Sequence, residues 1–257
     1  MQTGNKVRKL LAEGRAVTGM ILFTGSPMMI EMMAAAEVDF VIIDMEHSAL
    51  DLDRAAHCIR AADAAGVTPF VRVPEVDAAL IKKLLNLGCA GIALPHANRS
   101  NCLALLSAMR YAPLGERGAC PMVRAAGYSR GDWSAYAHRA NTETMAIPLL
   151  EDEASIADFD ALAAMPGLDV YFVGPTDLAI SLGVPGATFD EPKMRAALEK
   201  VVAAAKRHGK YVMTTVGNKL DVDYGRDIAR RGVQLIVYGT DADLFVDAIR
   251  RLQGMKA

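Results

Sequence analysis

Short apolar runs alternate with segments of helical periodicity along almost the whole chain. Runs that are apolar throughout are typical of parallel strands that are buried on both faces and covered by helices. We expect eight strands, at Val17–Phe23, Phe40–Ile43, Thr68–Val71, Gly91–Leu94, Met145–Leu150, Val170–Val173, Tyr211–Thr214 and Gln234–Val237. The alternation therefore predicts an α/β fold built on a parallel sheet.

The segments between these runs carry helix start and stop signals. The clearest helix is expected at Pro192–His208, where the proline suits the first turn and Gly209 follows the last one. Further helices are expected at Pro27–Ala36, Leu52–Ala65, Ala78–Leu87, Ser100–Tyr111 and Leu178–Leu182. Eight strands, each followed by a helix, predict a (β/α)8 TIM barrel that forms a single domain over residues 1–257. An open doubly wound sheet is the alternative.

Length and composition agree with one such domain and exclude several classes of protein. The chain has 257 residues, of which 52% are hydrophobic, and a net charge of −2. That balance gives no reason to expect nucleic acid as a partner. No apolar run is long enough to span a membrane, so no membrane segment is expected. The four cysteines lack metal-ligand or redox spacing, which indicates reduced thiols and a cytoplasmic location.

One segment interrupts the regular alternation. Residues Ala112–Arg130 are rich in glycine, arginine and proline and show no clear periodicity. Irregular segments of this length inside a compact domain usually serve the function or contact a partner. We therefore expect one of these two roles for it.

Acidic side chains and a histidine follow three of the expected strands at the point where each strand ends. Asp44, Glu46 and His47 follow the second strand, Glu151 follows the fifth and Asp177 the sixth. The carboxyl ends of parallel strands meet at one edge of the sheet, where barrel enzymes place their active sites. Burying four carboxylates together is costly unless a metal or a substrate compensates their charge. The pattern predicts a catalytic site.

Glu151 and Asp177 are the candidate metal ligands. Mg²⁺ and Mn²⁺ prefer oxygen ligands, and one or two carboxylates often suffice together with water and substrate. The alternative is that both acids are helix caps or first-turn acids, which the helix dipole favours. Spacing alone leaves both interpretations open.

His47 is the candidate general base, because an imidazole titrates near neutral pH. Asp44 is expected to orient the ring or raise its basicity, and Glu46 to modulate it. The alternative is a surface histidine in a loop. His96 follows the fourth strand and is expected to line the pocket. The remaining histidines are expected on helices that face solvent: His57, His138 and His208.

Two further groups at strand ends suit an anionic substrate. Arg72 ends the third strand, where a guanidinium fits an oxyanion or a carboxylate. An ion pair with Asp44 or Glu46 is the alternative, and the two roles are compatible. Gly174 and Thr176 begin a short helix whose free N–H groups attract a carboxylate, with an ordinary glycine turn as the alternative. No P-loop or dinucleotide pattern is present, so no nucleotide site is expected.

A Schiff-base mechanism needs a lysine at a strand end. Most lysines are expected on helical surfaces, and Lys210 precedes its strand, so it belongs to the opposite edge. Only Lys219, shortly after the seventh strand, is placed to reach the site. The metal route is therefore favoured.

With these residues in view, the chain resembles the metal-dependent (class II) pyruvate aldolases. This is the family of 4-hydroxy-2-oxoheptanedioate aldolase and 2-dehydro-3-deoxyglucarate aldolase, and the resemblance runs through nearly the whole chain. The motifs that carry it are Phe40–His47, Phe70–Arg72, Arg110–Gly118, Glu151 and Phe172–Leu178.

The resemblance implies reversible aldol cleavage of a 4-hydroxy-2-oxo acid to pyruvate and an aldehyde, within aromatic or sugar-acid catabolism. Glu151 and Asp177 would bind a divalent cation (Mg²⁺, Mn²⁺ or Co²⁺), and His47 would be the base. Arg72 would stabilise the enolate and hold the keto oxygen, and the Gly174–Thr176 backbone would receive the pyruvate carboxylate. A homo-oligomer is also implied, with a hexamer as one form and with sites near subunit contacts.

Three positions depart from the family pattern. Leu149 stands where the best-known aldolases have a glutamine, Asn86 where they have an aspartate, and Ile21 where they have a tryptophan. The first change is expected to alter substrate contacts at Leu149, and the loss of a charge at Asn86 to make the histidine a weaker base. Two alternatives follow from them. One is a lyase on acyl-CoA esters, similar to citrate lyase β-subunits, and the other is a non-catalytic barrel that binds an oxo acid.

Overall fold

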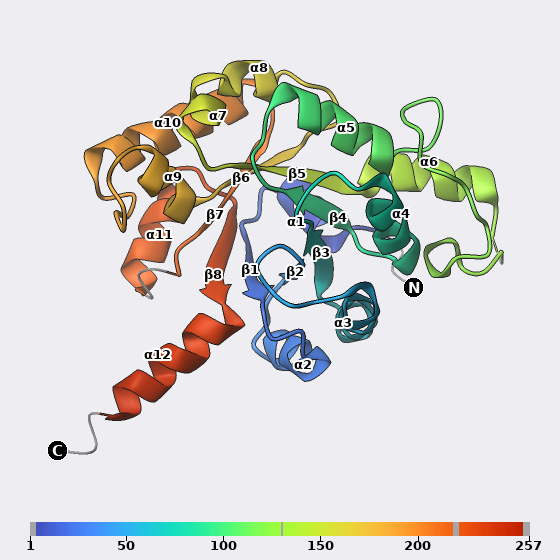
Figure 1. Ribbon diagram of the computed structural model, residues 1–257, viewed down its shortest axis with the longest axis horizontal. Helices are drawn as coiled ribbons and strands as arrows, with labels where there is room; N and C mark the ends of the chain where they lie inside the picture. Colours follow the sequence, from blue (N-terminus) through green and yellow to red (C-terminus); the bar gives the residue numbers. More distant parts are fainter. Residues whose placement is uncertain (1–3, 130, 218–220, 254–257) are drawn as a thin grey trace.

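The computed structural model describes residues 4–129, 131–217 and 221–253, which form a closed barrel of parallel strands (Figure 1). Each strand pairs with the next along the chain, and β8 returns to pair with β1. The strands are β1 (Val17–Leu22), β2 (Phe40–Asp44), β3 (Thr68–Arg72), β4 (Gly91–Leu94), β5 (Met145–Leu150), β6 (Val170–Val173), β7 (Tyr211–Thr215) and β8 (Leu235–Thr240). The predicted (β/α)8 barrel is confirmed.

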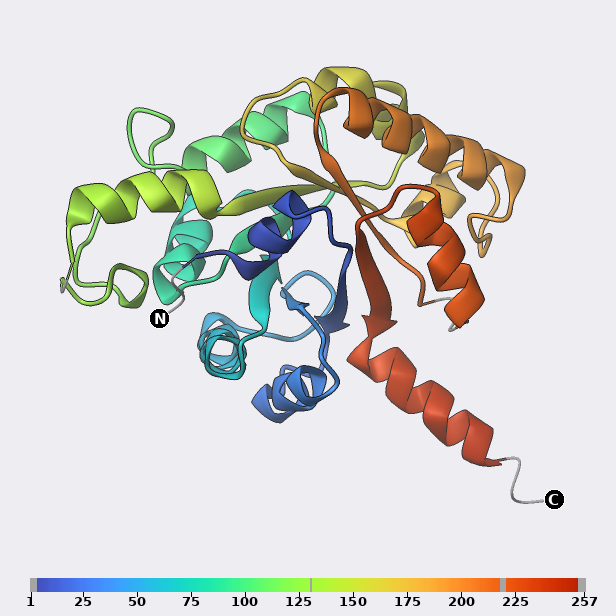
Figure 2. The same ribbon diagram turned by 180° about the vertical axis from the view of Figure 1, so that it is seen from behind.

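Helices follow the strands, and most of them cover the outside of the barrel (Figures 1 and 2). They are α1 (Lys6–Ala12), α2 (Pro27–Ala35), α3 (Leu52–Ala65), α4 (Ala78–Leu87), α5 (Arg99–Met109), α6 (Trp133–Glu143), α7 (Glu153–Ala157), α8 (Phe159–Ala163), α9 (Pro175–Ser181), α10 (Pro192–Arg207), α11 (Val222–Arg230) and α12 (Asp241–Gln253), with a 3₁₀ turn η1 at Arg124–Ala126. Side-chain caps fix several starts. At α5, Asn98 and Asn101 bond each other's backbone N–H in a reciprocal capping box.

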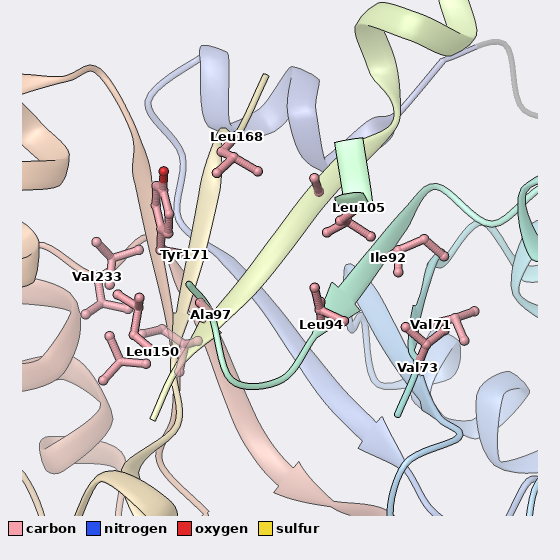
Figure 3. Packing of buried hydrophobic residues seen from close by; sticks show 14 of the residues in the cluster. Val71, Val73, Ile92, Leu94, Ala97, Leu105, Leu150, Leu168, Tyr171 and Val233 are labelled. Atoms are coloured by element: carbon pink, nitrogen blue, oxygen red, sulfur yellow. The ribbon is translucent and has the colours of Figure 1, made fainter. Parts of the chain in front are cut away.

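Two apolar clusters occupy the two faces of the strands. In β2, Val41 and Ile43 belong to the cluster between strands and helices, whereas Phe40 and Ile42 belong to the cluster inside the barrel. Figure 3 shows part of the outer cluster, where side chains of β3, β4 and β6 meet those from α5 and neighbouring segments. Because successive strand residues point to opposite faces and both faces are buried, the runs are apolar throughout.

A glycine makes room for an aromatic side chain in the barrel interior. Gly19 of β1 is the register partner of Phe40 in β2, and a Cβ on Gly19 would lie 2.2 Å from the Phe40 ring. The Phe40 ring in turn packs against Phe70, with 5.5 Å between the ring centroids. The missing side chain of Gly19 thus leaves the volume that the Phe40 ring fills.

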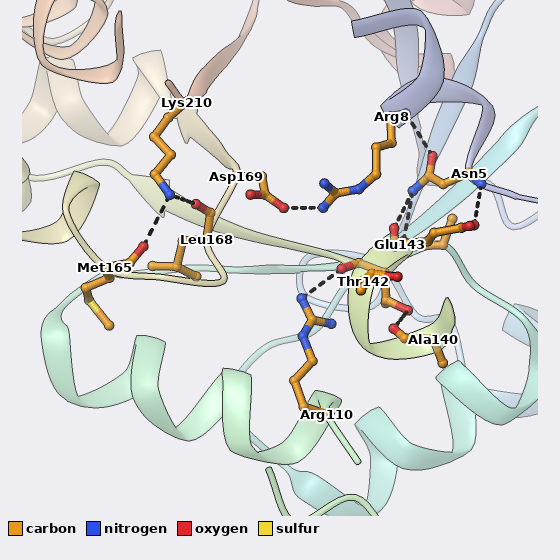
Figure 4. Close-up of polar contacts among 12 residues, drawn as sticks. Asn5, Arg8, Arg110, Ala140, Thr142, Glu143, Met165, Leu168, Asp169 and Lys210 are labelled. Carbon is orange, nitrogen blue, oxygen red and sulfur yellow. Dashed lines mark hydrogen bonds and ion pairs between the residues drawn. The ribbon is translucent and has the colours of Figure 1, made fainter. Parts of the chain in front are cut away.

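Polar contacts and α1 close the amino end of the barrel (Figure 4). The amide of Asn5 donates to the carbonyls of Ala90 at 3.3 Å and Glu143 at 3.1 Å, and Nζ of Lys210 donates to the carbonyl of Leu168 at 2.6 Å. The apolar side of α1 belongs to the inner cluster. This end of the barrel is therefore occupied by structural contacts, which leaves the carboxyl end for chemistry.

The last helix, α12, points away from the barrel (Figures 1 and 2). Its one buried residue is Asp241, whose carboxylate accepts the N–H groups of Phe23 at 2.7 Å and Thr24 at 3.2 Å. Phe245 and Ile249 are 68% and 41% exposed. The described part of the chain therefore leaves an apolar helical stripe uncovered. Among the described residues, no helix is long and apolar enough to cross a membrane.

The expected elements agree with the structure to within a residue or two at most ends. The helix expected at Leu178–Leu182 begins earlier, at Pro175. Proline is favoured at the first position of a helix, where its missing N–H costs no hydrogen bond. The strand expected to end at Val237 continues to Thr240. The described part of the irregular segment 112–130 contains only the η1 turn, as its composition predicts.

Candidate active site

Side chains from the carboxyl ends of four strands meet at one edge of the barrel. Asp44 ends β2 and Arg72 ends β3, and these two residues are register partners. Glu151 follows β5, and Asp177 lies in the first turn of α9, after β6. Burial raises the pKa of Glu46, and this carboxylate also interacts with the charges of Arg72 and Glu151. The side chains chosen from the sequence therefore form one electrostatic cluster.

The buried centre of this cluster is a two-point pair between Arg72 and Asp44. Nε and Nη2 of Arg72 donate to the two carboxylate oxygens at 2.9 and 2.8 Å, and Asp44 has no exposed surface. The sequence predicts that Asp44 orients the His47 ring. The structure instead gives the Asp44 oxygens to Arg72 and to backbone, including the N–H of Glu46 at 3.0 Å and of His47 at 3.4 Å. Asp44 thus shapes the loop and holds Arg72.

Glu46 supplies the carboxylate beside the imidazole. Its Oε2 lies 3.5 Å from Nε2 of His47 and 3.2 Å from Nε of Arg72. The His47 side chain is 55% exposed, whereas that of Glu46 is 14% exposed. The loop therefore places an open imidazole in front of a mostly buried acid, which suits a histidine that takes up and returns a proton.

Glu151 is buried, and each of its two oxygens has a different neighbour. Oε1 accepts the backbone N–H of His96 at 2.6 Å, and Nδ1 of the His96 ring lies 3.2 Å from the same oxygen. Oε2 faces Gly174, where a Cβ would lie 3.3 Å from it. Burial raises the pKa of Glu151, and the nearby charge of Asp177 acts in the same direction.

The residues present fit a hard divalent cation. Asp177 is exposed, and no described residue forms a hydrogen bond or an ion pair with it. Arg72 interacts with the charges of Asp44, Glu46 and Glu151, and Asp177 adds its charge beside Glu151, so a cation between Glu151 and Asp177 would offset their repulsion. No group of three or more His, Cys, Asp or Glu side chains suited to a metal exists among the described residues. Water and substrate would complete the coordination, as is usual for Mg²⁺.

Gly174 contributes space, while its N–H is already used. That N–H donates to the carbonyl of Leu150 at 3.0 Å, so it is not free for a substrate carboxylate as the sequence predicts. Pro175 has no N–H. The first backbone donor in α9 without an intrahelical acceptor is therefore that of Thr176.

Leu149 and Ile21 lie in the apolar interior of the barrel. Both belong to the inner cluster, and their exposed fractions are 1% and 6%. The Leu149 side chain is buried in the barrel, and the substrate contact predicted for it stays a prediction. The inward side of a barrel strand is filled by packing, so a residue two positions before Glu151 lies one layer lower.

Asn86 lies away from His47 within one chain. It belongs to the last turn of α4, and its Oδ1 accepts Nη2 of Arg117 at 2.9 Å. The Arg117 guanidinium also lies 4.5 Å from the centre of the Tyr111 ring. Barrel helices run opposite to the strands, so the end of α4 returns to the amino edge. The Asn86 side chain thus contacts Arg117, and the modulating role that the sequence predicts for it stays a prediction.

Two contributors to the site are not assigned a role by the sequence patterns. One is the backbone of His96, whose side chain is expected to line the pocket. The other is Asp241, which fixes Phe23 and Thr24 at the end of β1. Asp241 follows β8, so the strand-end rule that selects the other acids would also have found it. Lys219, the one lysine expected near the site, lies outside the described residues.

Comparison with known proteins agrees with this geometry. A family model described as HpcH/HpaI aldolase/citrate lyase matches residues 18–248. The chain belongs to this family. It is 34% identical over 211 residues to a hydroxypyruvate/pyruvate aldolase of Rhizorhabdus wittichii, covering 81% of this chain and 82% of the relative. It is 32% identical over 246 residues to a 4-hydroxy-2-oxovalerate aldolase of Rhodococcus jostii, covering 93% and 91%.

Solved structures of the family have the same architecture. One from Burkholderia cenocepacia superimposes with a TM-score of 0.88 at 31% identity, over 98% of this chain and 100% of that one. Membership confirms the resemblance that the motifs at Asp44–His47 and Gly174–Asp177 indicate. It also makes this HpcH/HpaI-family protein a carbon–carbon lyase of the aldolase type.

Proposed function

We propose that this HpcH/HpaI-family chain cleaves a 4-hydroxy-2-oxo acid reversibly into pyruvate, or a close 2-oxo acid such as hydroxypyruvate, and an aldehyde. The observation that carries the proposal is the grouping of His47, Glu46 and Arg72 beside the carboxylate of Glu151. The names of the relatives support the oxo-acid half of the substrate.

The oxo-acid end of the substrate belongs beside Glu151 and Asp177. When bound there, a divalent cation such as Mg²⁺, Mn²⁺ or Co²⁺ supplies Lewis-acid polarisation of the 2-oxo group. The Thr176 N–H in α9 has no acceptor within the helix, which supports a role in binding the substrate carboxylate. Arg72 directs Nε and Nη2 at Asp44, and no described residue takes a hydrogen bond from its Nη1, which remains for the developing enolate oxygen.

His47 is the group that moves the proton. Its imidazole accepts the C4 hydroxyl proton, directly or through water, as the C4 carbonyl forms and the C3–C4 bond breaks. The electron pair of that bond passes to the enolate of pyruvate, and protonation at C3 completes the methyl group. Glu46, 3.5 Å from Nε2, stabilises the imidazolium while it carries the proton.

A direct assay tests the proposal. 4-Hydroxy-2-oxo acids of increasing chain length are supplied with each cation, and pyruvate is measured with lactate dehydrogenase. His47→Ala and Asp177→Ala are each expected to abolish turnover with the fold retained, whereas the exposed His138→Ala, on α6, is expected to leave it unchanged. Near-normal cleavage by His47→Ala or Asp177→Ala would rule out the assigned roles.

We also propose that the chain works as a homo-oligomer in which α12 packs on a second copy. In a (β/α)8 barrel the helix after each strand normally covers the sheet, but α12 does not. Outward side chains near the uncovered wall are exposed, including Met28 at 59% and Met32 at 54% on α2, and Tyr238 at 39% on β8. One chain thus carries both an uncovered helix and an uncovered wall. In a dimer, α12 of each copy can cover the exposed wall of the other copy.

A hexamer stays a prediction from the resemblance to the family. Cytoplasmic location is likewise proposed, on the ground that the four cysteines are all unpaired.

A further inference from the structure

His96 has a backbone conformation that residues with a side chain seldom adopt. Its φ is 52°, in the left-handed region, immediately after β4. The amide of Asn101 donates to the His96 carbonyl at 2.6 Å, and that of Asn98 approaches the same oxygen at 3.4 Å. These two asparagines also form the capping box of α5. The start of a helix therefore fixes the turn at His96.

The turn directs two groups of His96 at one oxygen of Glu151. The backbone N–H donates to Oε1 at 2.6 Å, and Nδ1 of the ring lies 3.2 Å from the same atom. The ring is 73% exposed, whereas the Glu151 side chain is 5% exposed. An open imidazole thus lies over a buried carboxylate. The other oxygen, Oε2, is left beside Gly174, where the missing side chain keeps the space open.

We propose that His96 is a positioning residue for Glu151, holding Oε1 with its backbone N–H and its ring so that Oε2 is the oxygen offered to the cation. The inference rests on the metal-binding role given to Glu151 in the proposed function. A carboxylate ligand that is free to rotate gives up part of its binding free energy to become ordered. Hydrogen-bonding partners behind a metal ligand commonly change metal affinity by about 10–100-fold.

Direct coordination of the cation by the His96 ring is the competing interpretation. The geometry favours positioning because Nδ1 and the backbone N–H converge on the same Oε1, away from the Gly174 side of the carboxylate. The described residues also contain no cluster of three side chains suited to a metal. The two interpretations differ in whether a ring nitrogen is bonded to the metal.

The test measures Mn²⁺ affinity from the EPR signal of the free ion, without turnover. His96→Gly keeps the N–H and tolerates the left-handed backbone, so it removes the ring alone. His96→Ala removes the ring and also strains the turn. We expect His96→Gly to weaken Mn²⁺ binding by about 10-fold, His96→Ala to weaken it at least as much, and the exposed His138→Ala to bind like the parent.

Each outcome separates this inference from the proposed function. Failure of the folded parent protein to bind Mn²⁺ would overturn the metal role itself. Parent-like Mn²⁺ affinity in His96→Gly would overturn the positioning role of the ring, even if His96→Ala bound Mn²⁺ weakly. A nitrogen coupling in the spectrum of bound Mn²⁺ that His96→Gly removes would also overturn it, in favour of direct coordination.

Discussion

Arg72 neutralises a carboxylate that has no contact with solvent. Asp44 is fully buried and receives Nε and Nη2 of Arg72 at 2.9 and 2.8 Å. Removing the guanidinium leaves an uncompensated charge inside the barrel, so Arg72→Met is expected to lower the free energy of unfolding by about 3–5 kcal/mol. The double variant Arg72→Met/Asp44→Asn should recover much of that loss, since the orphaned charge is gone. Urea unfolding measures both.

A surface pair provides the control for this prediction. Lys6 lies 3.5 Å from Asp39, with half of the lysine side chain exposed. Lys6→Ala is expected to cost about 1 kcal/mol or less, because water screens the pair. If the single and double variants at Arg72 and Asp44 proved equally unstable, the buried pair would not be the source of the effect.

The cysteines should differ sharply in reactivity. Burial raises the pKa of Cys58 and Cys102 to about 11 and that of Cys89 to about 12, whereas Cys120 is exposed. At pH 8 a thiol of pKa 11 is about one part in a thousand thiolate, which is the reactive form. A thiol reagent is therefore expected to label Cys120 quickly and the three buried cysteines only on unfolding. Cys120→Ser should remove the fast phase, and a second fast thiol would contradict this.

At the scale of elements, the β1–β2 pair depends on a missing side chain. Gly19→Ala would place its Cβ 2.2 Å from the Phe40 ring, so it is expected to destabilise the barrel by about 1–3 kcal/mol. Gly19→Ala/Phe40→Leu should regain part of the loss by returning volume. Gly225→Ala, inside α11 with open space around it, should instead stabilise by about 0.5–1 kcal/mol. Thermal unfolding measures the stability of the three variants. Equal changes in Gly19→Ala and Gly225→Ala would refute the packing argument.

The elements themselves could be predicted because local patterns specify them. The apolar runs give β1 to β8, and the glycines after α3 and α4 adopt the left-handed conformation that ends a helix. The grouping of Glu46, His47, Arg72 and Glu151 follows from one rule, that parallel strands bring their carboxyl ends together. These features require no knowledge of side-chain rotamers.

Contacts between elements could not be read from the sequence. Whether Asp44 turns to the His47 ring or to Arg72 depends on the register of β2 against β3, which puts Asp44 opposite Arg72. The hydrogen bond from the Gly174 N–H to the Leu150 carbonyl depends on how far the pairing of β5 with β6 continues. The hydrogen bond from the His96 N–H to the Glu151 carboxylate depends on a turn that the capping box of the next helix sets. Each is a matter of a few ångströms in space.

At the scale of the whole molecule, the apolar side of α12 stays uncovered in an isolated chain. Phe245, Ile249 and Leu252 recur at helical spacing and are all substantially exposed. If they cover a second copy, Phe245→Asp/Ile249→Asp is expected to lower the molar mass in solution toward that of one chain. Light scattering after size exclusion measures this, with the exposed Arg60→Asp on α3 as control. A parent protein that is already monomeric would exclude the proposed exchange.

Enolate formation at the carboxyl end of the barrel can be measured without an aldehyde, by the exchange of the pyruvate methyl protons in D₂O. The protein is incubated with pyruvate and Mg²⁺, Mn²⁺ or Co²⁺, the metal is chelated, and the methyl signal is followed by NMR. We predict exchange that requires a cation and disappears in His47→Ala. No exchange with any of the three cations, or exchange that persists unchanged in His47→Ala, would contradict the account.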